Sequence, residues 1–403
     1  MTTPDDDFSL RRIAVPVFGP SILFGIATGA MMPIIALRAG ELGASAALAG
    51  FMAALVGLGS MVSNLPAAVL TARIGERRAI ILAAAFGLLG GVLGLVAQNL
   101  WLLGLGVVIL GGVTAIFNLA RQGYLTERVP FAMRARALST LGGSSRIGVF
   151  VGPFLASWFI HHFGLNGAFW VVIAANLATG ALTMAYPELP SSDEAQAHTA
   201  AQRNGKGPSL LQILQSHRHV FQTLGVGVVF FTMLRACRQV AIPLWGDHLG
   251  MAPATVTLIY GLTSAVDMLA FYPAGSIMDR YGRLWIALPS SLLMGLGLVL
   301  MPLAQGETLY IIISLMMGLG NGIGSGILMT LAADSAPAQG RPQFLGLWRL
   351  MSDLGACSGP FVLSGLTAAF TLGVGVSGIG ALGLLSAALF WHWMPHGKSV
   401  PKK

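Results

Sequence analysis

Apolar segments of about 20 residues follow one another along almost the entire chain, with short polar stretches between them. A helix of this length crosses the hydrocarbon core of a bilayer. Only 9% of the residues are charged, against roughly 25% in a soluble domain, so the chain lacks the polar surface of a body surrounded by water. The sequence therefore predicts an all-α membrane protein with twelve transmembrane helices, at 15–37, 46–70, 79–97, 101–124, 138–160, 167–187, 220–245, 253–277, 285–303, 308–331, 343–366 and 371–394.

The positive charges gather on one side of this topology. Seventeen of the 23 Lys and Arg residues lie on the side of the two termini, five lie within predicted helices, and only Arg38 lies on the opposite side. Cytoplasmic segments of membrane proteins carry such an excess. We therefore expect a multi-pass protein of a bacterial-type inner (plasma) membrane, with both termini in the cytoplasm. The net charge of +8 then reflects topology, and no nucleic-acid partner is expected.

The two halves of the chain repeat each other at a constant offset of 207 residues. This offset places Gly75 on Gly282, Pro130 on Pro337 and Gly152 on Gly359. Agreement without gaps in separate loops and helices predicts two pseudo-symmetric six-helix halves, 1–187 and 220–403, joined by a polar, loop-like cytoplasmic linker at 188–219. Parallel repeats of this kind are typical of one transporter architecture, in which the substrate site lies between the halves near the bilayer midplane.

The loop after the predicted helix at 253–277 reads GSIMDRYGR, and the equivalent first-half segment reads AVLTARIGER. The first of these resembles GxLxDRxGR, the signature loop of the major facilitator superfamily, and the second is a degenerate copy. The resemblance implies the major facilitator fold and gating loops that pair across helix ends, although incidental pairs in a positively charged loop are an alternative. We expect Arg280 or Arg283 to pair with Asp334, and Arg73 or Arg77 with Glu127. The gating candidates are Arg73, Gly75, Arg77, Glu127, Gly275, Asp279, Arg280, Gly282, Arg283 and Asp334.

The predicted helix at 138–160 contains GVFVGPFLAS, which resembles the GxxxGPxxGG motif of the drug:proton antiporter branch of the superfamily. Glycines at i and i+4 share a helix face and permit close contact with another helix, and proline bends a helix. The resemblance implies export by exchange, while ordinary close packing is the alternative. The helix-packing motif comprises Gly148, Gly152 and Pro153 and its second-half copy, Gly355, Gly359 and Pro360.

Ionisable residues within apolar helices are costly unless they are paired or hydrated, so each is a functional candidate. Arg349 and Asp353 are spaced to pair along one helix face. We also predict a pair between Arg146 and Asp267, because the fifth and eighth helices, here 138–160 and 253–277, pack together in the fold that the chain resembles. This pair serves either as a gate or as a static structural contact. The candidates for a substrate cavity are Arg146, Arg235, Arg238 and Arg349.

Proton coupling requires a carboxylate whose pKa can be raised by removal from water. Asp267 and Asp353 are the two acids predicted to lie within the membrane, and the resemblance adds Arg121, which lies in a sequence similar to the superfamily's RxxxG motif. The excess of arginine over aspartate favours an anionic or zwitterionic substrate over a cationic one, although Arg235 and Arg238 could instead reach toward the outer interface. The proton-coupling candidates are therefore Asp267, Asp353 and Arg121.

The sequence favours a secondary transporter that moves small organic molecules by alternating access, coupled to protons and directed outward. An importer, uniporter or exchanger of an organic anion is the alternative. A membrane-embedded enzyme is a remote alternative, because neither HExxH nor GxSxG occurs in the sequence. The sequence also contains no Walker A motif, so we do not expect transport driven directly by ATP. We expect a monomer without cofactor or metal, whose partners are protons, the bilayer and an anionic or amphipathic substrate.

Overall fold

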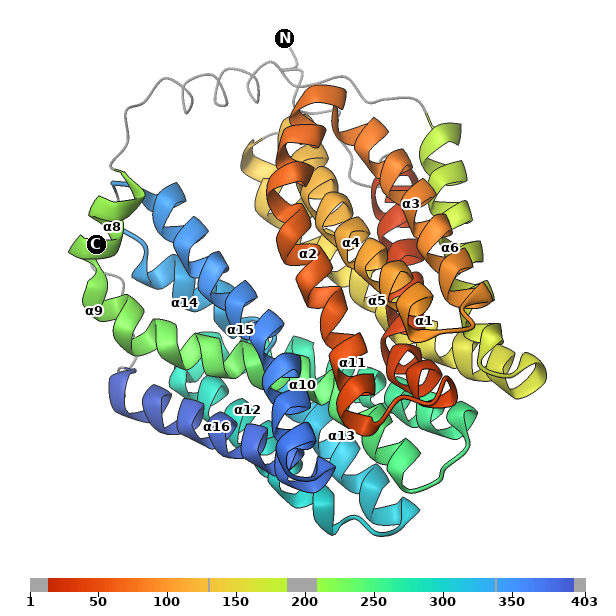
Figure 1. The fold of residues 1–403 in the computed structure, drawn as a ribbon. Helices are drawn as coiled ribbons and strands as arrows, with labels where there is room; N and C mark the ends of the chain where they lie inside the picture. Colours follow the sequence, from red (N-terminus) through yellow and green to blue (C-terminus); the bar gives the residue numbers. More distant parts are fainter. Residues whose placement is uncertain (1–13, 130, 187–208, 338, 395–403) are drawn as a thin grey trace. The chain divides into compact units, whose positions relative to one another are not determined.

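The structure is a computed structural model that describes residues 14–129, 131–186, 209–337 and 339–394. The described residues form helices joined by short turns (Figure 1). The first half comprises α1 (Gly19–Glu41), α2 (Ala46–Ile74), α3 (Glu76–Val96), α4 (Leu100–Arg128), α5 (Phe131–Phe163) and α6 (Asn166–Ala185). The second half comprises the short helices α8 (Leu210–Ser216) and α9 (Arg218–Val220), and then α10 (Val226–His248), α11 (Pro253–Tyr281), α12 (Leu284–Leu300), α13 (Glu307–Gly324), α14 (Ile327–Ser335), α15 (Arg341–Ala369) and α16 (Leu372–Trp393).

Ten helical segments in the described part of the chain are long and apolar enough to cross a membrane, with α13 and α14 counted as one. The other two long helices, α5 and α15, have 33 and 29 residues and are not among these ten. Together these are the twelve helices of two six-helix halves. The predicted all-α membrane fold is therefore confirmed.

The 207-residue repeat extends to the secondary structure. Helices α1 and α10 begin and end at equivalent residues, and so do α2 and α11. A π-helical turn also directly precedes the first long helix of each half, at Ala14–Phe18 and at Phe221–Gly225. The equivalent residues Gly75 and Gly282 both have positive φ angles, 83° and 103°, at the turn into the third helix of their half. Because glycine adopts this conformation without a steric penalty, the tight turn is present in both copies of the repeat.

One helix breaks the repeat. The first-half helix α4 is continuous, whereas its second-half equivalent is divided into α13 and α14 at Ser325 and Gly326. Glycine weakens a helix, and glycine–serine pairs are common sites of kinks. The second half has Gly324 and Gly326 where the first half has Phe117 and Leu119. The single helix predicted at 308–331 is therefore two helices.

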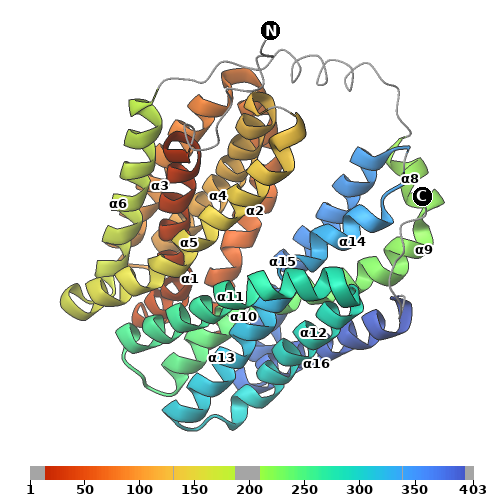
Figure 2. The same ribbon diagram turned by 180° about the vertical axis from the view of Figure 1, so that it is seen from behind.

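The contacts divide the chain into two units. Unit 1 comprises Met1–Ile34 and Leu58–Lys206, and unit 2 comprises Ile35–Gly57 and Gly207–Lys403. In unit 1, α3 packs against α4 and α6, and α5 packs against α6 (Figure 1). In unit 2, the equivalent helix α12 packs against α13 and α16, and α15 packs against α16 and α10 (Figure 2). The two copies thus build the same bundle from different side chains.

Residues 35–57, the end of α1 and the start of α2, pack within unit 2. The hydroxyl group of Ser364 donates a hydrogen bond of 2.6 Å to the backbone oxygen of Ala47. The rings of Phe51 and Phe361 meet edge to face with their centroids 5.6 Å apart. The division of the chain at residues 188–219 stays a prediction.

The predicted loop-like linker is helical where the structure describes it. Helix α8 begins after Ser209, whose Oγ accepts a hydrogen bond of 3.2 Å from the backbone N–H of Gln212. In return, the backbone N–H of Ser209 donates to Oε1 of Gln212 at 2.9 Å. This capping box satisfies N–H groups at the start of a helix. The prediction of a loop is therefore wrong for residues 210–216 and 218–219, while residues 188–208 lie outside the described part of the chain.

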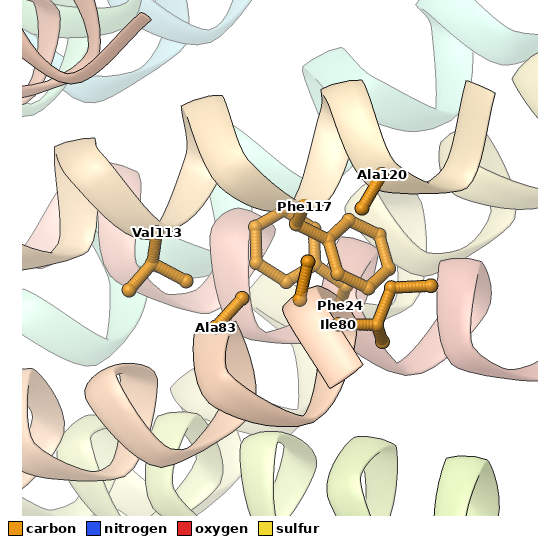
Figure 3. Close-up of a cluster of buried hydrophobic side chains, with 7 residues drawn as sticks. Phe24, Ile80, Ala83, Val113, Phe117 and Ala120 are labelled. Atoms are coloured by element: carbon orange, nitrogen blue, oxygen red, sulfur yellow. The ribbon is translucent and has the colours of Figure 1, made fainter. Parts of the chain in front are cut away.

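A cluster of buried apolar side chains joins α1, α3 and α4 in unit 1 (Figure 3). The rings of Phe24 and Phe117 stack at its centre, with centroids 4.0 Å apart and planes inclined by 17°. Stacked aromatic pairs contribute about 0.5–1.5 kcal/mol beyond the burial of their surface. Ile80, Ala83, Val113 and Ala120 surround the pair. The cluster fixes the positions of these three helices relative to one another.

The glycines of the GxxxGP motif lie where α5 crosses α1. A Cβ atom added at Gly148 would collide with the backbone oxygen of Ile22, and one at Gly152 with that of Ile26. The second half repeats both contacts, since a Cβ at Gly355 would collide with the backbone oxygen of Val229, and one at Gly359 would lie 2.8 Å from that of Met233. Small residues at such crossings let helix backbones approach closely in a membrane. The predicted close packing is confirmed in both halves.

We expect Gly148→Ala to lower the thermal unfolding midpoint of the purified protein by several degrees, because the new methyl group must push α5 away from α1 at a cost of about 1–3 kcal/mol. Gly142→Ala on the same helix is the matched control, since a Cβ there meets nothing within 4 Å. Equal midpoints for the two variants, measured by intrinsic fluorescence in detergent, would contradict this account of the motif.

Candidate functional site

Asp267 lies midway along α11 and is part of a polar network inside unit 2. Its Oδ2 accepts a hydrogen bond from the side-chain amide of Asn321 on α13 and lies 3.9 Å from Nη2 of Arg238 on α10. The amide oxygen of Asn321 accepts a hydrogen bond of 2.8 Å from Nε of Arg235. Asn321 therefore links Asp267 to a second arginine. Three helices, α10, α11 and α13, supply the four side chains.

The network is largely shielded from solvent. Arg238 is 3% exposed and Asp267 19% exposed. Arg238 also donates a hydrogen bond of 3.4 Å from Nη1 to the hydroxyl group of Thr263. Charges in such surroundings are screened only weakly, so the presence or absence of one charge strongly affects its neighbours. The alternative in which Arg238 reaches the outer interface is wrong, because its guanidinium group is buried.

Small residues of α13 bring the network together. A Cβ at Gly318 would lie 2.6 Å from the backbone oxygen of Thr263, and one at Gly322 would lie 2.8 Å from the Cα of Asp267. The backbones of α11 and α13 therefore touch at the level of Asp267, next to Asn321. On α10, Arg235 and Arg238 are three residues apart and share a helix face. Asn321 was not predicted as a site residue, because it carries no charge. The feature that could have identified it is a polar residue within the apolar run GLGNGIG.

Arg349 and Asp353 on α15 form the predicted i,i+4 pair, with Nε and Oδ2 3.8 Å apart. Their side chains are 60% and 40% exposed, so this pair is far more accessible than the pair of Arg238 and Asp267. Exposed pairs of this kind contribute little to stability. The prediction is confirmed for the contact, and the roles of both residues stay predictions.

The loop that resembles GxLxDRxGR forms the pair predicted for the second half. Nε of Arg283 donates to Oδ2 of Asp334 at 2.8 Å, and Nη2 lies 3.5 Å from Oδ1. The pair joins the start of α12 to the end of α14. The guanidinium group of Arg280 lies 5.4 Å from the centre of the Tyr281 ring instead. Of the two arginines offered for Asp334, Arg283 is therefore the partner.

The first-half copy of this loop makes different contacts. Arg77 at the start of α3 donates to backbone oxygens at the end of α6, those of Thr183 (3.2 Å), Met184 (3.1 Å) and Tyr186 (2.9 Å). A cation at the C-terminal end of a helix satisfies its last carbonyl groups and opposes its dipole. Arg73 is exposed, and the side chain of Glu127 lies outside the described part of the chain, so their predicted pairing stays a prediction. In place of Arg283, the first half has Glu76, which reverses the charge.

Two further arginines belong to unit 1. The guanidinium carbon of Arg121 on α4 lies 5.7 Å from the centre of the Phe117 ring. Arg146 on α5 is partly buried. Its predicted partner, Asp267, belongs to unit 2, so that pair stays a prediction.

A model of the Major Facilitator Superfamily matches residues 18–360 and 224–403 of the chain. The chain belongs to the major facilitator superfamily. An uncharacterised MFS-type transporter of Bacillus subtilis (strain 168), YdeG, is 25% identical over 405 residues, which cover 96% of this chain and 93% of YdeG. Multidrug resistance protein MdtH of Yersinia enterocolitica is 23% identical over 337 residues, covering 82% of this chain and 80% of MdtH. The protein is thus a multi-pass membrane transporter.

Solved structures share the fold of the superfamily member described here. A POT family transporter in complex with a thioalcohol-conjugated peptide matches with a TM-score of 0.76 and 13% identity, covering 95% of this chain and 96% of that one. The D-xylose-proton symporter matches with a TM-score of 0.71 and 16% identity, covering 95% and 98%. At such low identity the likeness concerns the fold alone.

We expect Asn321→Leu to lower the thermal unfolding midpoint, because Asp267 and Arg235 each lose a buried hydrogen bond, at a cost of about 1–3 kcal/mol. Thr257→Val is the control. It also removes a buried hydrogen bond, but one that stays within α11, from the Thr257 hydroxyl group to the backbone oxygen of Pro253 (2.8 Å). If both variants lose the same stability, Asn321 has no special place in the network.

A double-mutant cycle of Arg283→Gln and Asp334→Asn should give a coupling energy of about 0.2–1 kcal/mol, as is usual for partly exposed pairs. The coupling should shrink as salt is raised. Arg280→Gln, combined with Asp334→Asn, should give none, since Arg280 lies against Tyr281. Coupling of the same size for Arg280 would show that the charge of the loop matters and the contact does not.

Proposed function

We propose that this transporter exports small organic molecules in exchange for protons by alternating access, with Asp267 as the group that binds the proton. The contact between Asp267 and Arg238 carries the proposal. A carboxylate within a membrane bundle is retained at a cost and marks a functional position by default. Asp353 and Arg121 are the other candidates for coupling. Of the two aspartates, Asp353 is the less favoured candidate, because its side chain is more exposed.

Protonation of Asp267 would change what its neighbours bind. The ionised carboxylate accepts the Asn321 amide and attracts Arg238. A protonated carboxyl group is neutral and carries an O–H donor, so the attraction to Arg238 falls. The contact joins α10 to α11, and these two helices would then be free to shift. A buried pair that is made in one state and broken in another gives a two-state element that a proton can bias.

Export by exchange requires substrate and proton to compete for the same group. A substrate with a positive charge, or with hydrogen-bond donors, would bind the ionised form of Asp267 and leave when a proton arrives. This differs from the anionic or zwitterionic substrate that the excess of arginine alone favours. The name of the relative MdtH, a multidrug resistance protein, supports efflux. The resemblance of the segment around Gly148 and Pro153 to the antiporter motif supports it as well. The bacterial origin of the relatives supports an inner-membrane location.

The network itself supports a second candidate function, the uptake or exchange of an organic anion. It contains two arginines, Arg235 and Arg238, and one aspartate, Asp267. Protonation of Asp267 would raise its net positive charge by one, so an anion held by these arginines would bind more tightly together with the proton. Linkage is reciprocal, and proton and anion would then travel in the same direction. The sign of coupling therefore separates the two functions.

The pairs at the helix ends fit a gate. We assign Arg283 and Asp334, which join α12 to α14, to the gate on the cytoplasmic side, in keeping with the orientation expected from the positive charges. The protein would act as a monomer with both termini in the cytoplasm. Arg146 and Arg349 are further candidates for contact with the substrate.

Proton flux tests the proposal directly. Purified protein is reconstituted into liposomes containing a pH-sensitive dye, and a panel of lipophilic cations and organic anions is added under an imposed pH gradient. We expect cations to trigger proton movement opposite to their own in the wild type, and Asp267→Asn to lower this flux at least tenfold, because the amide cannot carry a proton. Co-directional movement of anion and proton would instead establish the second function.

Two control variants make the result specific. Glu307→Gln removes an exposed carboxylate at the start of α13 and should leave the flux unchanged. Asp353→Asn should alter it less than Asp267→Asn does. If Asp267→Asn retains full coupled flux while remaining folded, Asp267 is not the coupling group.

A further inference from the structure

A pocket lies inside unit 1, where the ends of four helices meet. The start of α1, the start of α3, the end of α4 and the end of α6 form its wall. Two of its lining residues are arginines, four carry hydroxyl groups and none is acidic: Arg77, Arg121, Ser21, Tyr124, Thr183 and Tyr186. Ile80 and Phe117 also line the pocket and belong to the apolar cluster of α1, α3 and α4 (Figure 3). The pocket is therefore a positively charged chamber on an apolar base.

The two guanidinium groups are held in place by their surroundings. Arg77 is fixed by three backbone oxygens at the end of α6, which occupy its Nε and Nη2. Its Nη1 donates to no protein atom that the structure describes. Arg121 is placed over Phe117, with 5.7 Å between its guanidinium carbon and the ring centre. Preorganised guanidinium groups bind oxyanions well, because little freedom is lost on binding.

The repeat shows that the fold does not require this pocket. Residues 207 positions later in unit 2 replace all six with aliphatic or large aromatic residues: Ser21 by Val228, Arg77 by Leu284, Arg121 by Leu328, Tyr124 by Leu331, Thr183 by Phe390 and Tyr186 by Trp393. There the space is filled, since Val228 and Phe390 are fully buried and the Phe390 ring lies against Gly227. The same bundle is thus stable with a packed apolar core at this place. The two arginines are therefore particular to unit 1, and the fold as such does not need them.

We propose that this pocket binds a phosphate-type oxyanion, either the headgroup of an anionic phospholipid or a soluble phosphate. Arginine forks match the geometry of phosphate oxygens, and tyrosine hydroxyl groups add neutral donors. The pocket lies at the helix ends that we expect to face the cytoplasm, at the depth of lipid headgroups. Basic pockets between transmembrane helices on this side are suited to such groups. The occupied pocket would tie α4 to α3 and α6.

Thermal unfolding with defined anions tests the proposal without any transport assay. The full-length protein is purified in dodecyl maltoside, which contains no phosphate, and unfolding is followed by intrinsic tryptophan fluorescence. One arm adds sodium phosphate against sodium chloride at equal ionic strength. The other adds phosphatidylglycerol against phosphatidylcholine. We expect at least one of these to raise the midpoint by about 2–4 °C, since a ligand that binds only the folded state stabilises it.

Variants decide whether the pocket is responsible. Arg121→Leu, which copies Leu328 of unit 2, should abolish the shift, and Arg121→Lys, which keeps the charge but not the fork, should reduce it. Arg78→Gln is the matched control, because Arg78 is an exposed neighbour of Arg77 outside the pocket lining. A response to phosphate alone assigns a soluble ligand, and a response to phosphatidylglycerol alone assigns a lipid. No response, or an equal response in Arg121→Leu and Arg78→Gln, would overturn the proposal.

Discussion

Close contact between helix backbones, made possible by glycine, is the constraint on which the rest of this structure depends. In a bilayer no hydrophobic force drives helices together, so they must gain van der Waals contact along their surfaces. Gly148 and Gly355 provide it where α5 meets α1 and α15 meets α10. Gly318 and Gly322 provide it between α13 and α11, and there the same contact brings Asn321 within reach of Asp267. Close contact at glycines therefore holds the helices together and also brings the side chains of the polar network within reach of one another.

The repeat separates what the fold requires from what this transporter has added. Features present in both halves, such as the positive φ angles at Gly75 and Gly282, serve the bundle. The charged groups discussed above mostly lack an equivalent. Asp267 falls on Ser60 and Arg121 on Leu328, while Arg283 falls on Glu76 with opposite charge. Because burial of a charge costs energy in either half, a charge kept in only one of them points to a role beyond stability.

The sequence was sufficient where one spacing or one motif determined the contact. The i,i+4 rule predicted Arg349 with Asp353, and the repeat located both the glycine turns and the closely packed helices. Sequence reasoning failed where the partner carries no charge. Arg77 binds backbone oxygens at the end of α6, and because every residue has such an oxygen the sequence does not mark these partners. Asn321 bridges its neighbours as a neutral amide. It also failed at the division of α13 from α14, which depends on how strongly two glycines weaken a helix in context.

The charge balance of the network limits what Asp267 can do. With Arg235 and Arg238 nearby, the ionised carboxylate leaves a net charge of about +1, and the protonated one about +2. A buried group with excess positive charge is costly unless an anion or water approaches it. Proton binding at Asp267 therefore either recruits an anion or drives Arg238 toward a wetter place. The first outcome links proton and anion in one direction; the second opens the contact between α10 and α11, and only it is compatible with exchange of a proton for a cation.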